Sequence, residues 1–456
     1  MKIHLIAIGG SVMHNLAIAL KKNGHIVSGS DDEIFEPSRS RLESYRLLPS
    51  AFGWFPDKID NTIDVIILGM HARIDNPELL RAQELGLKIY SYPEYLYEHS
   101  KNKKRVVIGG SHGKTTITAM IMHVMKHCSM DFDYLVGSKI ENFDVMVQLS
   151  DHASIMIFEG DEYLSSPIDR RPKFHWYHPH IALISGIAWD HINVFPTIEN
   201  YNEQFSKFIQ LIEKEGVLIY STDNEVLHGL VQENKRDDLE IIPYQVSDYL
   251  IEEGVTYLKS NGRNIPLKVF GKHNMMNLGG ARLVCKSMGI SENDFDEAIS
   301  GFEGTSNRLE LIERNDRFIL YKDFAHAPSK VKATINAVKE QYADYELIAC
   351  LELHTFSSLN KDFLSQYEGS FKMADKGCTY YNPHTVEMKK LEYISPNDIK
   401  EAFGKKDLEV FTDSAQMAEW LRETGEGKKV ILMMSSGNFN GIDFKKLFNL
   451  LSPSKF

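Results

Sequence analysis

The chain has 456 residues, of which 43% are hydrophobic and 25% are charged, so we expect a folded globular protein of about three domains. A formal net charge of −12 at pH 7 argues against nucleic acid as a partner, because a net-acidic surface repels phosphate chains. No apolar run reaches the ~20 residues that cross a bilayer and the N-terminus resembles no signal peptide, so we expect a cytoplasmic protein with no membrane partner.

Strand patterns alternate with helical patterns along the chain, in three blocks. The first block predicts a strand over 2–10, a helix over 14–24 and a strand over 25–31. The strands expected in the second block are 105–109, 154–158, 180–187 and 216–221, and those in the third block are 318–323, 345–353 and 428–436. Such alternation predicts α/β domains built on mostly parallel sheets.

The most specific motif is GSHGKTT, which follows the strand 105–109 and precedes a helical stretch. It consists of Gly110, Ser111, His112, Gly113, Lys114, Thr115 and Thr116. Backbone N–H groups of such a loop bind phosphate oxygens, the lysine neutralises the β- and γ-phosphates, and the first threonine offers a hydroxyl to Mg²⁺. A chance turn of this composition is the alternative. The strand before the motif and the helix after it favour a phosphate-binding loop.

Two strands of the second block lead into side chains that bind metal ions. The strand 154–158 runs into Glu159, and the strand 180–187 is followed by Asp190 and His191. Because the carboxyl ends of parallel strands meet at one crevice, we expect Glu159 and His191 to lie beside the phosphate-binding loop. Such ligands suit Mg²⁺ or Mn²⁺, although a strand-end acid is as often a helix cap and a lone histidine is more often structural.

Two later segments carry candidates for the rest of a nucleotide site. They are His273, Asn274 and Asn277 near the start of a predicted helix, and Arg308, Asp323 and His326 in the third block. Amide side chains can read a purine edge, but helix capping by Asn274 explains its position equally well. An arginine can stabilise a transferring phosphoryl group and an aspartate can hold ribose hydroxyls, while either can equally form a surface ion pair.

The turn after the first strand carries Gly9, Gly10 and Ser11 but lacks the G-x-G-x-x-G spacing of dinucleotide-binding proteins, which argues against a nicotinamide cofactor. The helix that follows can still bind a diphosphate at its N-terminus, so a nucleotide-sugar is the expected substrate there. Asp31, at the end of the second strand, is placed to contact ribose or uracil, and an aspartate that only closes a turn is the equal alternative.

Taken in order, these segments resemble the Mur ligase family along essentially the whole chain. The matching segments are IGG with VSGSD, GSHGKTT, FEGDEY, WDH, GKHNMMN, NRLE and DFAHAP. The resemblance implies an ATP-dependent amide ligase that uses Mg²⁺ and joins UDP-N-acetylmuramate to an amine, as a monomer or weak dimer. It implies a Rossmann-like domain for the UDP substrate over 1–103, a central ATP-binding P-loop domain over 104–305 and a Rossmann-like domain for the amine over 306–456.

The resemblance also implies roles for individual residues. The implied catalytic residues are Lys114, Glu159, His191, Arg308 and His326, and the implied magnesium ligands are Thr115, Glu159 and His191. The residues implied to contact the rest of ATP are His273, Asn274, Asn277, Arg308 and Asp323.

The chain departs from the family pattern at several positions. Ser185 and Gly186 stand where the family commonly has an asparagine, and Ala327 stands where a second histidine is common. Some members carry a carbamylated lysine where this chain has Phe205, with Lys207 nearby, so we predict no carbamylation.

Within the family, the segments DRRPKF, WDHINVFP, DFAHAP and SSGNFNG favour the branch whose amine substrate is the tripeptide L-Ala-γ-D-Glu-meso-diaminopimelate. The alternatives are a ligase that adds free L-alanine and a non-catalytic nucleotide-binding regulator. Arg170 and Arg171, together with Lys173, form a basic cluster that can bind the carboxylates of the peptide, and a solvated surface loop is the equal alternative. Further candidates for the peptide site follow two strands of the third block: His354, Ser357, Ser358, Ser435, Ser436 and Asn438.

Overall fold

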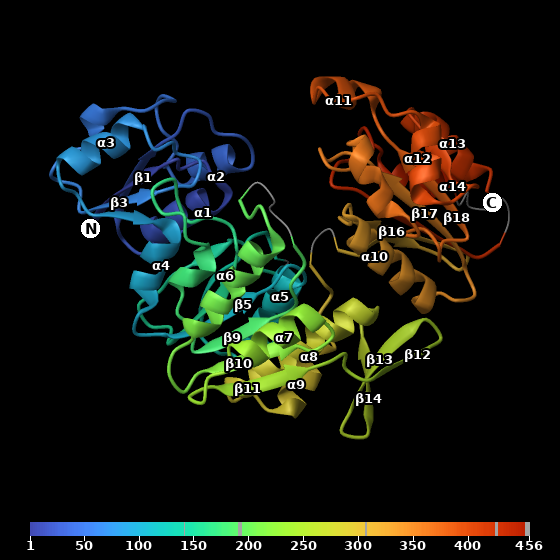
Figure 1. Cartoon of the computed structure of the whole chain (residues 1–456), viewed down its shortest axis with the longest axis horizontal. Coiled ribbons are helices and arrows are strands. Elements are labelled where there is room, and N and C mark those ends of the chain that lie inside the picture. Colours follow the sequence, from blue (N-terminus) through green and yellow to red (C-terminus); the bar gives the residue numbers. More distant parts are fainter. Residues whose placement is uncertain (141, 190–193, 306–307, 425–426, 452–456) are drawn as a thin grey trace. The chain divides into compact units, whose positions relative to one another are not determined.

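The computed structural model describes residues 1–140, 142–189, 194–305, 308–424 and 427–451. Their contacts divide the chain into two compact units (Figure 1). The first unit contains Met1–Ser247 and Met276–Ile299, and the second contains Asp248–Met275 and Ser300–Phe456. The chain therefore passes between the units after Ser247, after Met275 and after Ile299.

The first unit begins with a four-stranded parallel sheet in the order β2-β1-β3-β4. Its strands are β1 (Lys2–Ile6), β2 (Ile26–Ser30), β3 (Val65–Leu68) and β4 (Ile89–Ser91), and its helices are α1 (Ser11–Lys22), α2 (Ser38–Ser44), η1 (Pro56–Lys58), α3 (Pro77–Glu84) and α4 (Tyr92–Ser100). The predicted strand, helix and strand at the N-terminus are confirmed as β1, α1 and β2. The N-terminus of α4 is stabilised by a capping box formed by Ser91 and Glu94.

A seven-stranded sheet follows in the order β11-β10-β9-β5-β8-β6-β7, parallel except for the β6–β7 pair. Its strands are β5 (Lys104–Gly109), β6 (Asp133–Leu135), β7 (Val147–Gln148), β8 (Ile155–Glu159), β9 (Ile181–Ile184), β10 (Val217–Ser221) and β11 (Glu240–Tyr244). The accompanying helices are α5 (Lys114–His127), η2 (Lys173–Trp176), α6 (Ile198–Gln210), α7 (Glu225–Glu233), α8 (Lys272–Ser287) and α9 (Glu292–Ile299). All four strands predicted for this block are present.

The second unit is built on a six-stranded sheet in the order β15-β16-β20-β17-β18-β19, in which only β15 is antiparallel to its neighbour. Its strands are β15 (Glu310–Arg314), β16 (Phe318–Asp323), β17 (Glu346–Glu352), β18 (Lys376–Tyr380), β19 (Glu409–Phe411) and β20 (Lys429–Met434). Its helices are α10 (Pro328–Gln341), η3 (Lys361–Tyr367), α11 (Pro383–Met388), α12 (Pro396–Phe403), α13 (Ser414–Arg422) and α14 (Phe444–Leu451). Buried residues cover both faces of this sheet.

A small antiparallel sheet, β12-β13-β14, was not predicted from the sequence. Its strands are β12 (Tyr249–Glu252), β13 (Val255–Ser260) and β14 (Arg263–Leu267). It packs on α10, where the Thr256 hydroxyl donates to the Gln341 side chain at 2.6 Å. These residues therefore group with the second unit, although they precede the last helices of the first unit in sequence. The domain limits at 103 and 305 stay predictions.

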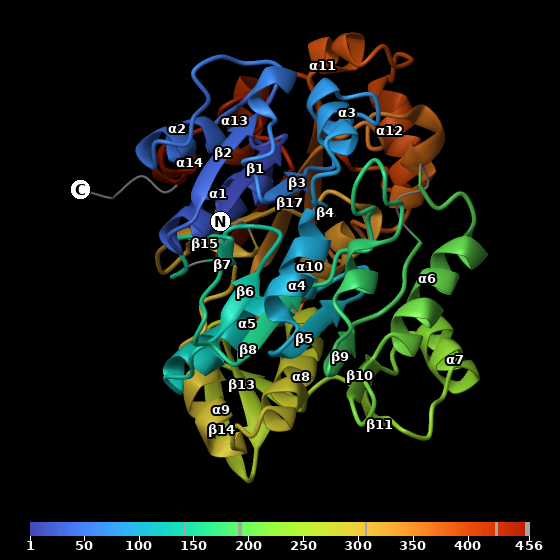
Figure 2. The same ribbon diagram turned by 90° about the vertical axis from the view of Figure 1, so that its left-hand side faces the viewer.

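Within the first unit the two sheets share one continuous core. The helix α4 lies between them in both views (Figures 1 and 2). The junction is held by Arg105 of β5, whose side chain is 3% exposed. Its guanidinium donates to the carbonyls of Ser100 and Lys101 at the end of α4, at 3.1 and 2.9 Å, and to the Tyr177 carbonyl at 2.9 Å. One buried cation thus satisfies carbonyl groups from separate segments.

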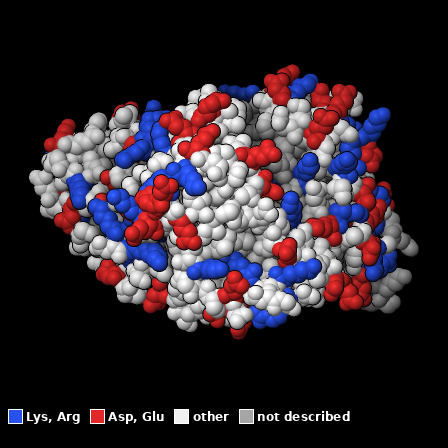
Figure 3. All heavy atoms as spheres, turned by 60° about the horizontal axis from the view of Figure 1, so that its bottom comes forward, with Lys and Arg blue, Asp and Glu red and all other residues white. Residues whose placement is uncertain are grey.

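No helix of the described residues is long and apolar enough to cross a membrane. On the face shown in Figure 3, lysine and arginine side chains are interspersed with aspartate and glutamate. That face therefore presents no broad field of a single sign.

We predict that Arg105→Met destabilises the protein by about 3 kcal/mol or more, because it leaves several buried carbonyls and Glu213 without their donor. Urea unfolding followed by circular dichroism measures the effect. Lys207→Ala is the control, since Lys207 forms only an exposed pair with Glu203 and should change stability by no more than about 0.5 kcal/mol. Equal stabilities of the two variants would contradict the role of Arg105.

Candidate active site

The phosphate-binding loop connects the end of β5 to the start of α5 and depends on two glycines. Gly110 and Gly113 adopt φ angles of 120° and 78°, which side chains rarely tolerate. A Cβ atom at Gly113 would lie 2.3 Å from Oδ1 of Asn277, and one at Gly110 would lie 2.3 Å from Oγ of Ser185. The structure thus places Asn277 of α8 directly against the loop.

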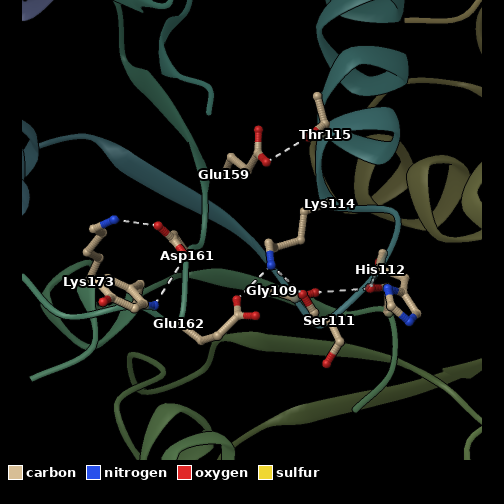
Figure 4. Close-up of polar contacts among 12 residues, drawn as sticks. Gly109, Ser111, His112, Lys114, Thr115, Glu159, Asp161, Glu162 and Lys173 are labelled. Atoms are coloured by element: carbon tan, nitrogen blue, oxygen red, sulfur yellow. Dashed lines mark hydrogen bonds and ion pairs between the residues drawn. The ribbon is translucent and has the colours of Figure 1, made fainter. Parts of the chain in front are cut away.

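Lys114, the first residue of α5, is held by two oxygens. Its ammonium donates to the Gly110 carbonyl at 2.7 Å and to Glu162 Oε2 at 2.6 Å (Figure 4). The other oxygen of Glu162 accepts from the Tyr201 hydroxyl at 3.1 Å, and that hydroxyl lies 3.0 Å from Oγ of Ser111. A chain of polar contacts therefore connects the lysine to the backbone of its own loop.

The charges around Lys114 keep it protonated. Burial by itself lowers the pKa of Lys114, but the carboxylates of Glu162 and Asp161 outweigh that effect and raise the pKa above its ordinary value. Glu162 is 2% exposed, so its charge is little screened by water. At neutral pH the loop therefore presents a fixed positive charge.

Glu159 and Thr115 meet beside the loop. The Thr115 hydroxyl donates to Glu159 Oε1 at 2.7 Å, and the Gly137 N–H donates to the other carboxylate oxygen at 2.8 Å. Burial raises the pKa of Glu159, against the opposing effect of these hydrogen bonds. Two oxygen donors from adjacent elements are the ligand type that Mg²⁺ prefers, so the pair fits the expected metal.

The third implied ligand, His191, lies outside the described residues. Among the residues that are described, no group of three or more His, Cys, Asp or Glu side chains gathers as a metal cage. Mg²⁺ in nucleotide sites is commonly held by one or two carboxylates together with phosphates and water, so the Thr115–Glu159 pair does not need such a cage.

The basic cluster of DRRPKF divides between two environments. Arg170 and Arg171 are exposed, and Arg171 is held locally by Asp169 at 3.0 Å and by the Trp176 ring, whose centroid is 4.0 Å away. Lys173 instead turns inward and forms an ion pair with Asp161. Of the three cations of the cluster, Lys173 therefore reaches the acidic segment, which we define as residues 159–162 with the acids Glu159, Asp161 and Glu162.

The turn after β1 is closed by Asp31. Its carboxylate accepts from the Gly9 N–H at 2.7 Å and from the Asp32 N–H at 3.0 Å, and burial raises the pKa of Asp31 to about 6. Gly10 and Ser11 form the start of α1, and Gly10 contributes no side-chain cap. The contacts of Asp31 are thus those of the turn-closing alternative.

In the second unit, the side chains of Arg308 and His326 both lie against the ring of Phe324. The Arg308 guanidinium lies 5.6 Å from the centroid of Phe324, and the His326 ring lies edge-on to Phe324 at 5.1 Å. Asp323, the last residue of β16, is 4% exposed and accepts from the Leu309 N–H at 2.7 Å. Burial raises the pKa of Asp323 above its ordinary value.

His273 and Asn274 also belong to the second unit. Burial, aided by the charge of Arg308, lowers the pKa of His273 to about 4, so its imidazole is neutral at pH 7. Asn274 lies inside α8 and donates to the Phe270 carbonyl at 2.8 Å. It therefore does not cap the helix N-terminus, which was one of the two explanations for its position.

Three models of the Mur ligase family match the chain: the family's catalytic domain over residues 2–104, the middle domain over 108–285 and the glutamate ligase domain over 307–437. A UDP-N-acetylmuramate–L-alanine ligase of Caldicellulosiruptor bescii is 30% identical over 82% of this chain and 82% of its own. This chain belongs to the Mur ligase family. It is an ATP-dependent carbon–nitrogen ligase, as the members of that family are.

Other relatives span almost the whole Mur ligase. A protein of the same name from Caldicellulosiruptor saccharolyticus is 28% identical over 96% of each chain. A murein peptide ligase of Psychrobacter arcticus matches all of both chains with a TM-score of 0.60 and 22% identity. The UDP-N-acetylmuramate–alanine ligase of Thermotoga maritima covers 99% of this chain and 98% of its own, with a TM-score of 0.68 and 19% identity. These structures share the fold, which confirms the predicted three-domain α/β class.

Two of the departures from the family pattern, Ser185 and Phe205, have structural explanations in this Mur ligase. The Ser185 hydroxyl donates to the His112 carbonyl, so it supports the phosphate-binding loop from the end of β9. Phe205 is fully buried and packs edge-on against Phe174 and Tyr201. A charged group at position 205 would have to displace this aromatic cluster.

Sequence analysis of this Mur ligase missed Tyr201. The residue lies on α6, about 90 positions beyond the loop that it contacts, and its helix shows an ordinary amphipathic pattern. A tyrosine on the buried face of such a helix predicts core packing and gives no sign of a hydroxyl contact.

We predict that Gly113→Ala abolishes most ligation and lowers stability by about 1–2 kcal/mol, because alanine is strained at this φ angle and its methyl group meets Asn277. Gly229→Ala is the matched control. Gly229 lies in α7 with no atom near its Cβ position, so alanine should stabilise the helix by about 0.5–1 kcal/mol and leave activity unchanged. Thermal unfolding and phosphate release measure both effects. An active Gly113→Ala enzyme would disprove the steric argument.

Proposed function

We propose that this Mur ligase uses ATP to join the carboxylate of UDP-N-acetylmuramate to the amine of a peptide. The observation that carries the proposal is the phosphate-binding loop with a protonated Lys114 and the Thr115–Glu159 oxygen pair at one end of the central sheet. A carboxylate is a poor acyl donor because its oxygen is a bad leaving group. Phosphorylation of that oxygen by ATP removes the obstacle.

The proposed reaction has two steps. In the first, a carboxylate oxygen of the muramate bonds to the γ-phosphorus of ATP while the bond to the bridging oxygen breaks, and ADP leaves with the electron pair. In the second, the amine nitrogen bonds to the carbonyl carbon, inorganic phosphate leaves, and the nitrogen loses a proton. The protein's work in the first step is to position reactants and neutralise charge.

We assign roles to the residues of the first unit accordingly. Lys114 would leave Glu162 and pair with the transferring phosphate, whose charge attracts it more strongly than a single carboxylate does. Thr115 and Glu159 would hold Mg²⁺, with His191 as the further ligand, and the ion would supply positive charge beside the phosphates. The remaining loop residues, Ser111, His112 and Thr116, would contact phosphate oxygens.

The nucleotide and muramate sites extend to other segments of the chain. We propose that Asn277, His273 and Asn274 contact the adenine, and that Arg308, Asp323 and His326 act on the phosphates and ribose. The UDP diphosphate would bind at the start of α1, at the turn of Gly9, Gly10 and Ser11 that Asp31 closes by accepting from the Gly9 N–H. We also propose the domain limits 1–103, 104–305 and 306–456.

The proposed peptide site consists of polar side chains after two strands of the second unit, and the buried acid Glu352 holds the segments that carry them. Glu352 at the end of β17 is 4% exposed and accepts from the Ser435 hydroxyl, which follows β20, and from the Phe439 N–H at 2.8 Å. His354 lies 3.7 Å from Glu352. Free L-alanine is the second candidate, because relatives that cover most of this chain carry the name UDP-N-acetylmuramate–L-alanine ligase.

We predict that Lys114→Ala lowers ligation by about two orders of magnitude or more, as the loss of a phosphoryl-stabilising charge does. Phosphate release with UDP-N-acetylmuramate, Mg-ATP and amine measures the effect. Because the variant leaves Glu162 without its cation, Lys114→Ala with Glu162→Gln should recover thermal stability but not activity. Near-normal ligation by either folded variant would refute the assignment.

The amine preference separates the two candidate functions. We predict that phosphate release is at least about tenfold faster with L-Ala-γ-D-Glu-meso-diaminopimelate than with L-alanine at equal concentration, because groups that pair with remote carboxylates are left unpaired by the smaller amine. A preference for L-alanine would assign this chain to the alanine-adding reaction instead.

A further inference from the structure

The Lys173 side chain points into the protein, whereas those of Arg170 and Arg171 in the same basic cluster are exposed. It is the first residue of η2, and its backbone N–H donates to the Tyr163 carbonyl at 2.9 Å. A β-bridge between Leu164 and Pro172 closes the preceding loop. The loop thereby returns the chain to the acidic segment, and the Lys173 side chain is only 12% exposed.

The ammonium of Lys173 lies at the junction of the two sheets of the first unit. It pairs with Asp161, two residues beyond Glu159, and it lies 5.7 Å from the ring centroids of both Tyr163 and Tyr92. Tyr92 is the first residue of α4, which follows the last strand of the N-terminal sheet. A substrate that binds at the N-terminal sheet and reacts at the phosphate-binding loop has to extend across this junction.

Two lysines from different elements form ion pairs with the acidic segment. Lys114 binds Glu162 and Lys173 binds Asp161, and Figure 4 shows the two lysines reaching the segment from different elements. Each of these two neighbouring acids thus holds one ammonium group.

A purely structural role explains this arrangement poorly. Ion pairs removed from water contribute little net stability, because desolvation offsets their attraction. The proposed reaction brings a carboxylate and a triphosphate to a segment where three carboxylates, those of Glu159, Asp161 and Glu162, already outnumber the two lysines. If Lys114 pairs with the phosphates, the incoming carboxylate needs a second cation.

We propose that Lys173 is that cation: its ammonium transfers from Asp161 to the carboxylate of the muramate substrate and holds it while it is phosphorylated. This inference rests on the proposed function, in which an anionic carboxylate is the acceptor of the phosphoryl group. Asp161 is then a resting partner that positions the lysine until the substrate arrives. Arg170 and Arg171, which face solvent, take no part in this contact.

The test compares Lys173→Met with the double variant Lys173→Met, Asp161→Asn. We expect Lys173→Met to weaken UDP-N-acetylmuramate binding in calorimetry at least tenfold and to lower kcat/KM for that substrate about a hundredfold, while KM for ATP changes less than threefold. Lys173→Arg should recover part of the activity. Lys339→Met is the control, because Lys339 forms a partly buried pair with Asp375 in the second unit.

The double variant separates substrate binding from simple neutralisation of Asp161. If Lys173 only balances that carboxylate, removing both charges restores ligation, and this result would overturn the proposal. If Lys173 holds the substrate, the double variant stays as impaired as Lys173→Met. The double variant contains no unpaired charge, so it carries the test even if Lys173→Met alone unfolds. A wild-type enzyme that ligates no amine to UDP-N-acetylmuramate would instead refute the proposed function.

Discussion

The ion pair between Lys114 and Glu162 is the contact on which the phosphate site depends. A nearly buried ammonium group without a partner would lose its proton or turn toward water, and either change would remove the charge that phosphate requires. Glu162 prevents both outcomes, and it is itself held by Tyr201. Because the same hydroxyl contacts Oγ of Ser111, Tyr201 is connected both to the partner of the lysine and to a side chain of the loop.

That support has to offset the strain of the loop. Gly110 and Gly113 adopt left-handed conformations, and the space beside them is filled by Ser185 and Asn277. Segments from β9 and α8 therefore enclose a loop that is local in sequence. Backbone strain persists at functional sites when the surrounding structure determines the conformation from several sides, and the continuous core of the first unit supplies that rigidity.

The acidic side chains at the site of this Mur ligase are likewise each held by a partner. Each acid from Glu159, the last residue of β8, to Glu162 already has a donor: Thr115 for Glu159, Lys173 for Asp161 and Lys114 for Glu162. Each carboxylate in this poorly solvated place therefore has a hydrogen-bond donor. A phosphate, which carries more negative charge than one carboxylate, can then replace Glu162 at Lys114 without leaving that ammonium group unpaired.

The sequence by itself determined the parts of the site that are local. The glycines of GSHGKTT, the strand before them and the helix after them are neighbours along the chain, so their geometry follows from short-range rules, and the alternation of strands and helices predicts the α/β class. Only the tertiary structure decided between residues that look alike in sequence. Lys173 faces the acidic segment while Arg171 faces solvent, and Asn277 lies against the loop while Asn274 donates to the Phe270 carbonyl just before its own helix. Tyr201 lies at the site although no sequence motif marks it, because the direction of a side chain depends on the packing of elements that are distant in sequence.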